Sequence, residues 1–391
     1  MAVVVLGGAG HIGSGIVMEL LRISPELEVV VADKNVEKGN ELARKLGGNV
    51  SVIEVDAEDF SSLVETFRRA EAVVSALGPF YLHGERVLKA AIKAGVNLVD
   101  VNDDYDATER CLKLDGDAKK AGIVAIIGLG ATPGITNIMA KYGARGIEVE
   151  EINTAWAWTA VDPSMGRAIV KHFFHAITGE VPTYRDGKIV MVKALSEPEI
   201  VEFPHLGKME VSHVGHPEPI TIPRYIRARS VTNKGTIWPR ALADIAKSFA
   251  RIGLTRDASL SLLGRSVILR DLLVDIVLKL EDFISPELME EVLKELQTLG
   301  DYAMGLGIRV EVRGKRGDEE IRRLYSLSSP SAVRATALPA ALGVLEVMKK
   351  GLDVSGVYPP EGAIEPSKFL KELAKEFEIW EVEERRSIVK P

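Results

Sequence analysis

The chain has 391 residues, of which 46% are hydrophobic and 27% charged, and its formal net charge is −7. This composition is typical of a globular enzyme with more than one domain, and the acidic balance argues against nucleic acid as a partner. No apolar run approaches the ~18 residues of a membrane helix, and glycine interrupts the apolar start. We therefore expect neither a membrane span nor a cleavable signal, and a cytoplasmic location.

Two features of the composition bear on redox state and habitat. Cys111 is the only cysteine, so no internal disulfide can form, and its helical surroundings predict a partly buried small side chain. Gln297 is the only glutamine among many Glu, Lys and Arg residues, a bias that suits a thermophile.

The first residues form a glycine-rich motif directly after a short apolar segment. Residues 2–6 are apolar, and residues 8–13 fit the pattern G-x-G-x-x-G. Such glycines allow a tight strand-to-helix turn, a close approach of the backbone to a pyrophosphate, and close packing of the helix on its strand. The pyrophosphate then lies on the free N–H groups of the helix. The residues expected to bind it are Gly8, Gly10, His11 and Ile12.

The second predicted strand, 27–32, ends at an acidic residue. Asp33 lies 20 residues beyond Gly13, where a carboxylate accepts hydrogen bonds from the ribose of adenosine. Its charge repels a 2′-phosphate, which favours NAD over NADP, although the neighbouring Lys34 weakens this preference. Asp56, after the third strand, is a further candidate for cofactor binding. An acid in an ordinary turn between strand and helix is the alternative reading of Asp33.

Strand and helix patterns alternate through the first third of the chain. Further strands are predicted at 49–55, 72–77, 96–101 and 123–127, with helices at 60–67, 84–94 and 108–121. Continuous apolar strands of this kind suit a parallel sheet covered on both faces, with ligands bound at the carboxyl ends of the strands.

Three loops at these carboxyl ends are candidates for the active site. Ala76, Leu77 and Gly78 would face the cofactor, or form an ordinary turn before Pro79. The acids at 103–104 would receive a substrate amine or move protons, with Asp103 the first choice. The alternative is that Asp103, Asp104 or Asp106 caps the next helix. In 128–134, Gly130 would allow close approach of the nicotinamide or substrate, and the helix after Pro133 would hold a carboxylate. The same segment could also serve as a hinge between domains.

The remainder reads as a mixed α+β domain followed by a helical tail. A helix is predicted at 135–145, strands at 152–159, 200–203, 208–211, 220–222 and 307–313, a hairpin at 186–187, helices through 240–299, and tail helices at 336–348 and 366–377. Residues 232–236 read as a polar turn, and Arg224 as either a carboxylate clamp or surface charge.

The histidines do not form a metal-binding pattern. His172 and His175 share one helical face but have no evident partner acid, and His205, His213 and His216 read as surface residues. We therefore predict no metal site.

Taken together, several segments resemble the saccharopine dehydrogenase family, which includes lysine 6-dehydrogenases and carboxynorspermidine dehydrogenases. They are GGAGHIGSG at 7–15, VVSALGPF at 73–80, AGVNLVDVNDD at 94–104, AGIVAIIGLGATPGITN at 121–137, ATALPAALGVLEVMKKG at 335–351 and GVYPPE at 356–361. The resemblance spans both ends of the chain and is loose between 150 and 330.

The resemblance implies an α/β fold in two parts. One is a Rossmann domain of residues 1–135 completed by the tail 334–391, and the other is an inserted α+β domain, 136–333, that binds substrate and forms a homodimer. It also implies hydride transfer at a C–N bond of an amino acid such as saccharopine or lysine. The implied substrate residues are Phe80, Tyr81, Asp104, Thr132, Pro133, Gly134, Arg224, Gly235 and Thr236, and the catalytic candidates are Asp103 and Tyr81.

Two other functions remain compatible with the same cofactor domain. One is a dehydrogenase or reductase that acts on a non-amine substrate, since a fold does not determine a reaction. The other is a regulatory protein that binds NAD(P) without turnover.

Overall fold

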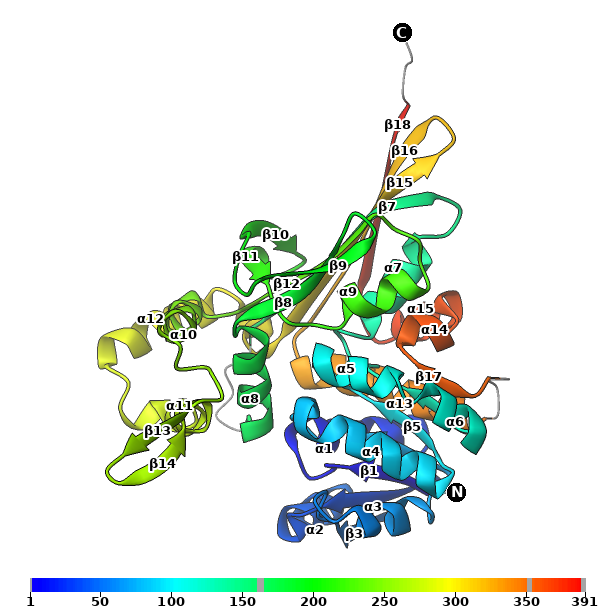
Figure 1. Ribbon diagram of the computed structural model, residues 1–391, viewed down its shortest axis with the longest axis vertical. Helices are drawn as coiled ribbons and strands as arrows, with labels where there is room; N and C mark the ends of the chain where they lie inside the picture. Colours follow the sequence, from blue (N-terminus) through cyan, green and yellow to red (C-terminus); the bar gives the residue numbers. More distant parts are fainter. Residues whose placement is uncertain (1, 160–164, 350–353, 388–391) are drawn as a thin grey trace. The chain divides into compact units, whose positions relative to one another are not determined.

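The computed structural model describes residues 2–159, 165–349 and 354–387, and it divides the chain into two compact units (Figure 1). The first unit comprises Met1–Ile138 and Val333–Pro366, and the second comprises Met139–Ala332 and Ser367–Pro391. Both units are therefore built from segments that are far apart in sequence. Among the described residues, no helix is long and apolar enough to cross a membrane.

The first unit is built on a seven-stranded parallel sheet. Its strands are β1 (Ala2–Leu6), β2 (Glu28–Asp33), β3 (Val50–Glu54), β4 (Ala72–Ser75), β5 (Asn97–Asp100), β6 (Val124–Ile126) and β17 (Gly356–Tyr358). They lie in the order β17-β6-β5-β4-β1-β2-β3. The chain thus builds outward from β1 in both directions, so the strand order reverses between β1 and β4. This is the doubly wound arrangement of dinucleotide-binding domains, in which ligands lie at that reversal.

Helices connect these strands. They are α1 (His11–Ile23), α2 (Val36–Leu46), α3 (Phe60–Phe67), α4 (Phe80–Ala94), α5 (Tyr105–Leu112), α6 (Asp115–Ala121), α13 (Ala332–Met348) and α14 (Pro360–Ala363). Val3, Val4, Val5 and Leu6 of β1 are all buried, so helices cover both faces of the sheet as its continuous apolar strands predict.

One predicted helix of this unit is wrong. The pattern over 108–121 is divided into α5 and α6 by a break at Lys113 and Leu114. The carboxylate of Asp115, at the start of α6, accepts a hydrogen bond of 3.0 Å from Val357 N in β17. This contact with the distant tail orients α6 separately from α5, which local periodicity does not reveal.

The second unit is built on a nine-stranded mixed sheet. Its strands are β7 (Glu148–Trp158), β8 (Glu180–Arg185), β9 (Lys188–Lys193), β10 (Glu199–Phe203), β11 (Gly207–His213), β12 (Ser230–Ile237), β15 (Leu306–Arg316), β16 (Glu319–Ser329) and β18 (Ile379–Ser387). The main order is β10-β11-β12-β7-β15-β16-β18, and β8 pairs with β12 and β9. Strands β12 and β7 are parallel, and the other pairs are antiparallel.

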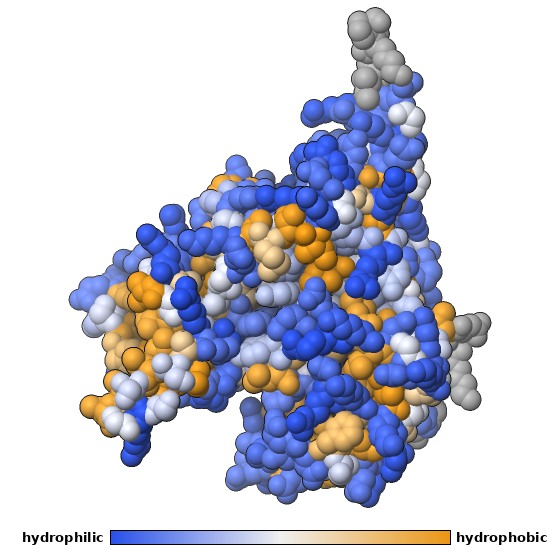
Figure 2. All heavy atoms as spheres, in the orientation of Figure 1, coloured by the Kyte–Doolittle hydropathy of each residue, from blue (hydrophilic) through white to orange (hydrophobic). Residues whose placement is uncertain are grey.

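Helices and a small hairpin complete this unit. They are α7 (Ile135–Gly143), which begins in the first unit, α8 (Arg167–Ala176), α9 (Glu218–Thr221), α10 (Arg240–Ile252), α11 (Leu269–Val277), α12 (Pro286–Gln297), α15 (Pro366–Leu373) and the hairpin β13 (Ser259–Leu262) and β14 (Arg265–Ile268). Short 3-10 turns lie at Ile222–Arg224, Leu280–Asp282 and Gly300–Met304. Apolar side chains gather over the hairpin and α11 in Figure 2, and Leu262 and Leu263 of the hairpin are exposed.

Three predictions for this unit are wrong. The strand expected at 220–222 is replaced by α9 and a 3-10 turn, since prolines at 217 and 219 favour a helix start. The polar turn expected at 232–236 lies inside β12, because pairing with β7 overrides the weak strand propensity of these residues. The tail expected in the first domain is divided: β18 pairs with β16 along the edge of this sheet.

Candidate functional site

The glycine-rich loop joins β1 to α1 in a conformation that only glycine permits. A Cβ at Gly13 would lie 2.0 Å from the carbonyl oxygen of Gly7, and one at Gly8 would lie 2.8 Å from that of Val5. Gly10 caps α1 without a side-chain hydrogen bond. The loop thus offers bare backbone at the positive end of a helix dipole, which is the arrangement that binds a pyrophosphate. This is the position predicted for Gly8, Gly10, His11 and Ile12.

The loop after β4 lies against this glycine-rich loop. Ala76 N donates a hydrogen bond of 2.9 Å to Leu6 O at the end of β1. A Cβ at Gly7, whose φ is +73°, would lie 3.2 Å from the backbone of Ala76 and Leu77. Two loops predicted to contact the cofactor, 7–13 and 76–78, are therefore adjacent at the point where the strand order reverses.

Asp33 is connected to the same loop. Its Oδ2 accepts a hydrogen bond of 3.0 Å from Ala9 N, and its Oδ1 accepts one of 2.9 Å from Asn35 N. These bonds fix the carboxylate at the end of β2, beside the glycine-rich loop. The ammonium of Lys34 forms an ion pair of 2.8 Å with Asp56. The hydrogen bond of this pair raises the pKa of Lys34 and lowers that of Asp56.

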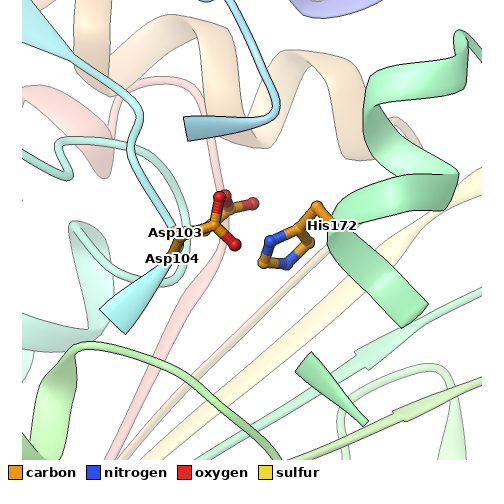
Figure 3. A group of neighbouring side chains, drawn as sticks. All are labelled: Asp103, Asp104 and His172. Atoms are coloured by element: carbon orange, nitrogen blue, oxygen red, sulfur yellow. The ribbon is translucent and has the colours of Figure 1, made fainter. Parts of the chain in front are cut away.

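The acids after β5 divide into structural and candidate catalytic residues (Figure 3). Asp104 is completely buried, and its Oδ2 accepts a hydrogen bond of 2.8 Å from Tyr81 N at the start of α4. It occupies the N-cap position of α5 but makes no side-chain cap, so the predicted capping role is not what its carboxylate does. Asp103 is partly exposed, and its carboxylate lies within 4.8 Å of that of Asp104. This places Asp103 where a bound molecule could reach it.

A buried acid that the sequence reading did not select connects two of the candidate loops. Asp100 Oδ1 accepts hydrogen bonds of 3.0 Å from Asn102 N and 2.7 Å from Gly128 N. Burial raises the pKa of Asp100 to about 7, while the two N–H groups act in the opposite direction. The available signal was an acidic residue at the end of an apolar strand.

The loop 128–134 is compact rather than extended. Gly130 and Gly134 form an isolated bridge, and a Cβ at Gly134, whose φ is +126°, would lie 1.9 Å from Gly130 O. Asn137 Oδ1 accepts a hydrogen bond of 3.0 Å from Gly134 N, and its Nδ2 donates one of 2.9 Å to the buried carboxylate of Glu361. Through Asn137, the returning GVYPPE segment is thus hydrogen-bonded to the loop that contains Thr132 and Pro133.

The substrate candidates of the second unit lie in different environments. Arg224 is exposed at the end of a 3-10 turn, and Gly235 and Thr236 lie within β12. A Cβ at Gly235 would lie 2.2 Å from the indole ring of Trp156, so this glycine makes room for an aromatic side chain. That packing accounts for Gly235 without a ligand.

Two histidines of this unit were misread as surface residues. His213 and His216 are both buried, whereas His205 is more exposed. His216 Nδ1 lies 3.4 Å from the buried carboxylate of Glu218, and its ring packs 5.2 Å from that of Trp156 and 5.7 Å from that of His172. Their polar, turn-rich surroundings predict exposure, and only the tertiary packing buries them. His172 is drawn on α8 in Figure 3.

Comparison with known proteins covers nearly the whole chain. Residues 3–126 match the model of the saccharopine dehydrogenase NADP binding domain, and residues 130–379 match that of the saccharopine dehydrogenase C-terminal domain. The carboxyaminopropylagmatine dehydrogenase of Synechocystis sp. is 21% identical over 96% of each chain. The lipid droplet localized protein of Caenorhabditis elegans is 32% identical, and the match covers 33% of this chain and 32% of that protein.

A solved structure supports the same relationship at the level of the fold. Apo saccharopine dehydrogenase (L-Glu forming) from Saccharomyces cerevisiae has a TM-score of 0.66 and 16% identity, covering 99% of this chain and 100% of that one. The matches to both family domains, the two-unit fold and the loops at the strand reversal agree: this chain belongs to the saccharopine dehydrogenase family.

Proposed function

We propose that this protein is an NAD(P)-dependent oxidoreductase that transfers a hydride at a C–N bond of an amino acid related to saccharopine or lysine. The observation that carries the proposal is the contact between the loops after β1 and β4, where a Cβ at Gly7 would lie 3.2 Å from the backbone of Ala76 and Leu77. The dehydrogenase relative from Synechocystis is named for carboxyaminopropylagmatine, a compound with carboxyl and amino groups, which supports an amine substrate.

Different residues of the first unit would bind the cofactor and accept the proton of the substrate. The backbone from Gly8 to Ile12 would hold the pyrophosphate, and the loop with Leu77 and Gly78 would position the nicotinamide. When bound, the nicotinamide supplies the acceptor or donor of the hydride. A substrate amine must lose its proton before a hydride leaves the adjacent carbon. Asp103 is the proposed acceptor of that proton, because it is the more accessible of the two neighbouring carboxylates.

We propose NAD as the preferred cofactor. The carboxylate of Asp33 is fixed at the end of β2, where the ribose hydroxyls of the cofactor would lie, and its charge opposes a 2′-phosphate. Lys34, which could have attracted that phosphate, is already paired with Asp56. The name of the matched family domain refers to NADP, so the cofactor has to be tested directly.

The activity is tested by following absorbance of the reduced nicotinamide with NAD⁺ or NADP⁺. Lysine, saccharopine, ornithine and diaminobutyrate would be offered in parallel, together with carboxyaminopropylagmatine. We expect turnover with at least one amine. Binding of the cofactor without turnover of any amine would instead favour the regulatory alternative.

Asp103→Asn should lower kcat by about 100-fold or more, because the amide cannot accept the substrate proton. The effect should shrink at high pH, where the free amine is already neutral. Asp106→Asn is the matched control, since Asp106 pairs with Arg110 one turn further along α5. Full activity of the Asp103 variant would exclude this residue as the proton acceptor.

A further inference from the structure

Asn102 is a buried amide in the loop after β5 that the proposed mechanism leaves unused. It lies directly before Asp103, the proposed proton acceptor, and it is completely buried. Its Oδ1 accepts a hydrogen bond of 3.0 Å from Asp104 N, and its Nδ2 donates one of 3.2 Å to Thr108 Oγ1 in α5. Burying a polar amide costs free energy unless its atoms are hydrogen-bonded, and here both are. The amide thus joins the loop to the helix that follows it.

The residues on either side of Asp103 are both anchored within the first unit. Before it, Asn102 N donates a hydrogen bond of 3.0 Å to Asp100 Oδ1 at the end of β5. After it, Asp104 Oδ2 accepts a hydrogen bond of 2.8 Å from Tyr81 N at the start of α4. Asn102 and Asp104 are both completely buried, whereas Asp103 between them is partly exposed. Asp103 therefore presents an accessible carboxylate on a backbone that is held on both sides.

The amide of Asn102 closes the short turn that carries Asp103. Because its Oδ1 accepts a hydrogen bond from the N–H two residues further on, the chain bends around Asp103 in an Asx turn. A general base must come within about 2.6–3.2 Å of the atom whose proton it accepts. A misplacement of about 1 Å can cost about 100-fold in rate. The bond that shapes this turn is therefore expected to affect proton transfer, although Asn102 itself has no contact with solvent.

We propose that Asn102 is a positioning residue, whose buried amide places the carboxylate of Asp103 for transfer of the substrate proton. The inference rests on the proposed function, because Asn102 would act only through the proposed proton acceptor. Thr108 supports the amide from α5, so its hydroxyl belongs to the same arrangement. A purely structural role is the alternative, in which the same bonds stabilise the first unit without affecting the reaction. The two roles predict different kinetics.

The first test measures kcat, with the amine that the wild type turns over, and the Kd of the cofactor. Asn102→Ala should lower kcat about 10- to 100-fold and leave the cofactor Kd unchanged, because Asp103 acts on the substrate. Asn102→Ser should recover part of the loss, since a hydroxyl can close the same turn more weakly. Asn97→Ala is the matched control: it removes a hydrogen bond of 2.8 Å from Val124 N at the opposite end of β5 and should leave kcat unchanged. An unchanged kcat in Asn102→Ala, or an equal fall in Asn97→Ala, would overturn the inference.

The second test asks whether Asn102 acts through Asp103. When Asp103→Asn has already removed the base, adding Asn102→Ala should lower kcat little further, because the group that the amide places is gone. Independent losses that multiply would show a purely structural role and overturn the inference. Thr108→Val removes the partner of the Asn102 amide with little change in size, and it should give a smaller loss that also vanishes in the Asp103→Asn background. This variant decides the question if Asn102→Ala does not fold.

A failure of this inference differs from a failure of the proposed function. If the wild type oxidises an amine and Asn102→Ala does so equally well, only the role of Asn102 is refuted. If the wild type turns over no amine, the proposed function fails and the role in proton transfer fails with it. Amide hydrogen exchange adds a readout without turnover: Asp104 N–H should exchange at least about 10-fold faster in Asn102→Ala than in the wild type or Asn97→Ala. Equal protection of Asp104 N–H in all three proteins would overturn the inference.

Discussion

At the scale of single residues, two carboxylates of the first unit accept similar hydrogen bonds but differ in their burial. Asp33 and Asp100 both end parallel strands and both accept two backbone N–H groups. Asp33 is partly exposed beside the glycine-rich loop, whereas Asp100 is buried between two loops. Their difference in burial leads to two different predictions.

Asp33→Ser should change the cofactor preference. Removal of the carboxylate abolishes its repulsion of a 2′-phosphate and its bonds to the ribose, so the ratio of kcat/KM for NADP⁺ to that for NAD⁺ should rise at least 10-fold. Lys34→Ala is the matched control, because its ammonium is already paired with Asp56, and it should change the ratio little. A wild-type enzyme that prefers NADP⁺ would show that Asp33 does not select the cofactor.

Asp100→Asn should make the protein more stable than the wild type at neutral and higher pH. The pKa of Asp100 is about 7 in the folded chain against 3.8 in its reference state, so the folded protein binds this proton more tightly. The wild type therefore loses stability as pH rises from about 4 to 7, by an upper limit of about 4 kcal/mol. Urea unfolding of both proteins at several pH values measures this difference. A constant difference between pH 4 and 8 would contradict the assignment.

At the scale of elements, close packing decides whether a glycine within a helix can be replaced by alanine without loss of stability. Helix propensity alone favours alanine at any such glycine by about 0.5–1 kcal/mol. The surroundings of Gly343 in α13 and Gly84 in α4 differ sharply. A Cβ at Gly343 would lie 2.1 Å from Leu129 Cδ2, while one at Gly84 would lie no closer than 3.6 Å to any neighbour.

Gly343→Ala should therefore destabilise the first unit, and Gly84→Ala should stabilise it. Overpacking at Gly343 should cost about 1–3 kcal/mol, which outweighs the gain in helix propensity. At Gly84 the added methyl fits, so the gain of about 0.5–1 kcal/mol should remain. Chemical denaturation of both variants measures the two signs. Equal effects at both positions would mean that Leu129 moves aside without cost.

At the scale of the whole molecule, both units are closed by segments from the far end of the chain. The first unit gains β17 and α13, and the second gains β18. Strand β18 forms the last position in its sheet and leaves one edge without a neighbouring strand among the described residues. Exposed sheet edges pair readily with another chain unless they are protected. Exposed Trp380 and Val382 lie on this strand.

We expect a homodimer formed by antiparallel pairing of two β18 strands. With a two-fold axis at Glu383, Glu381 of one copy would lie opposite Arg385 of the partner. Arg385→Glu should then weaken the dimer at least 10-fold, and the double variant with Glu381→Arg should restore it. Sedimentation equilibrium measures both. A wild-type protein that remains monomeric at roughly 50–100 µM would refute this arrangement.

Local patterns in the sequence were sufficient to predict the fold of the first unit. The glycine spacing of 8–13, the acid at 33 and the alternation of apolar strands with helices predicted a doubly wound sheet, and the sheet order confirms it. These signals are readable because a covered parallel strand must be apolar along its length and because the turn at a pyrophosphate excludes side chains.

Tertiary structure decided what depends on distant partners. The sequence could not show that 232–236 is a strand, that the tail divides between two sheets, or that His213 and His216 are buried. It also could not show that Asp104 bonds to Tyr81 N rather than to its own helix. In each case the deciding contact joins residues that are far apart in the chain or on neighbouring elements, and local propensity carries no information about such a contact. The order and identity of the elements around the cofactor loop came from the sequence, whereas the burial of single side chains and the pairing of distant strands came from packing.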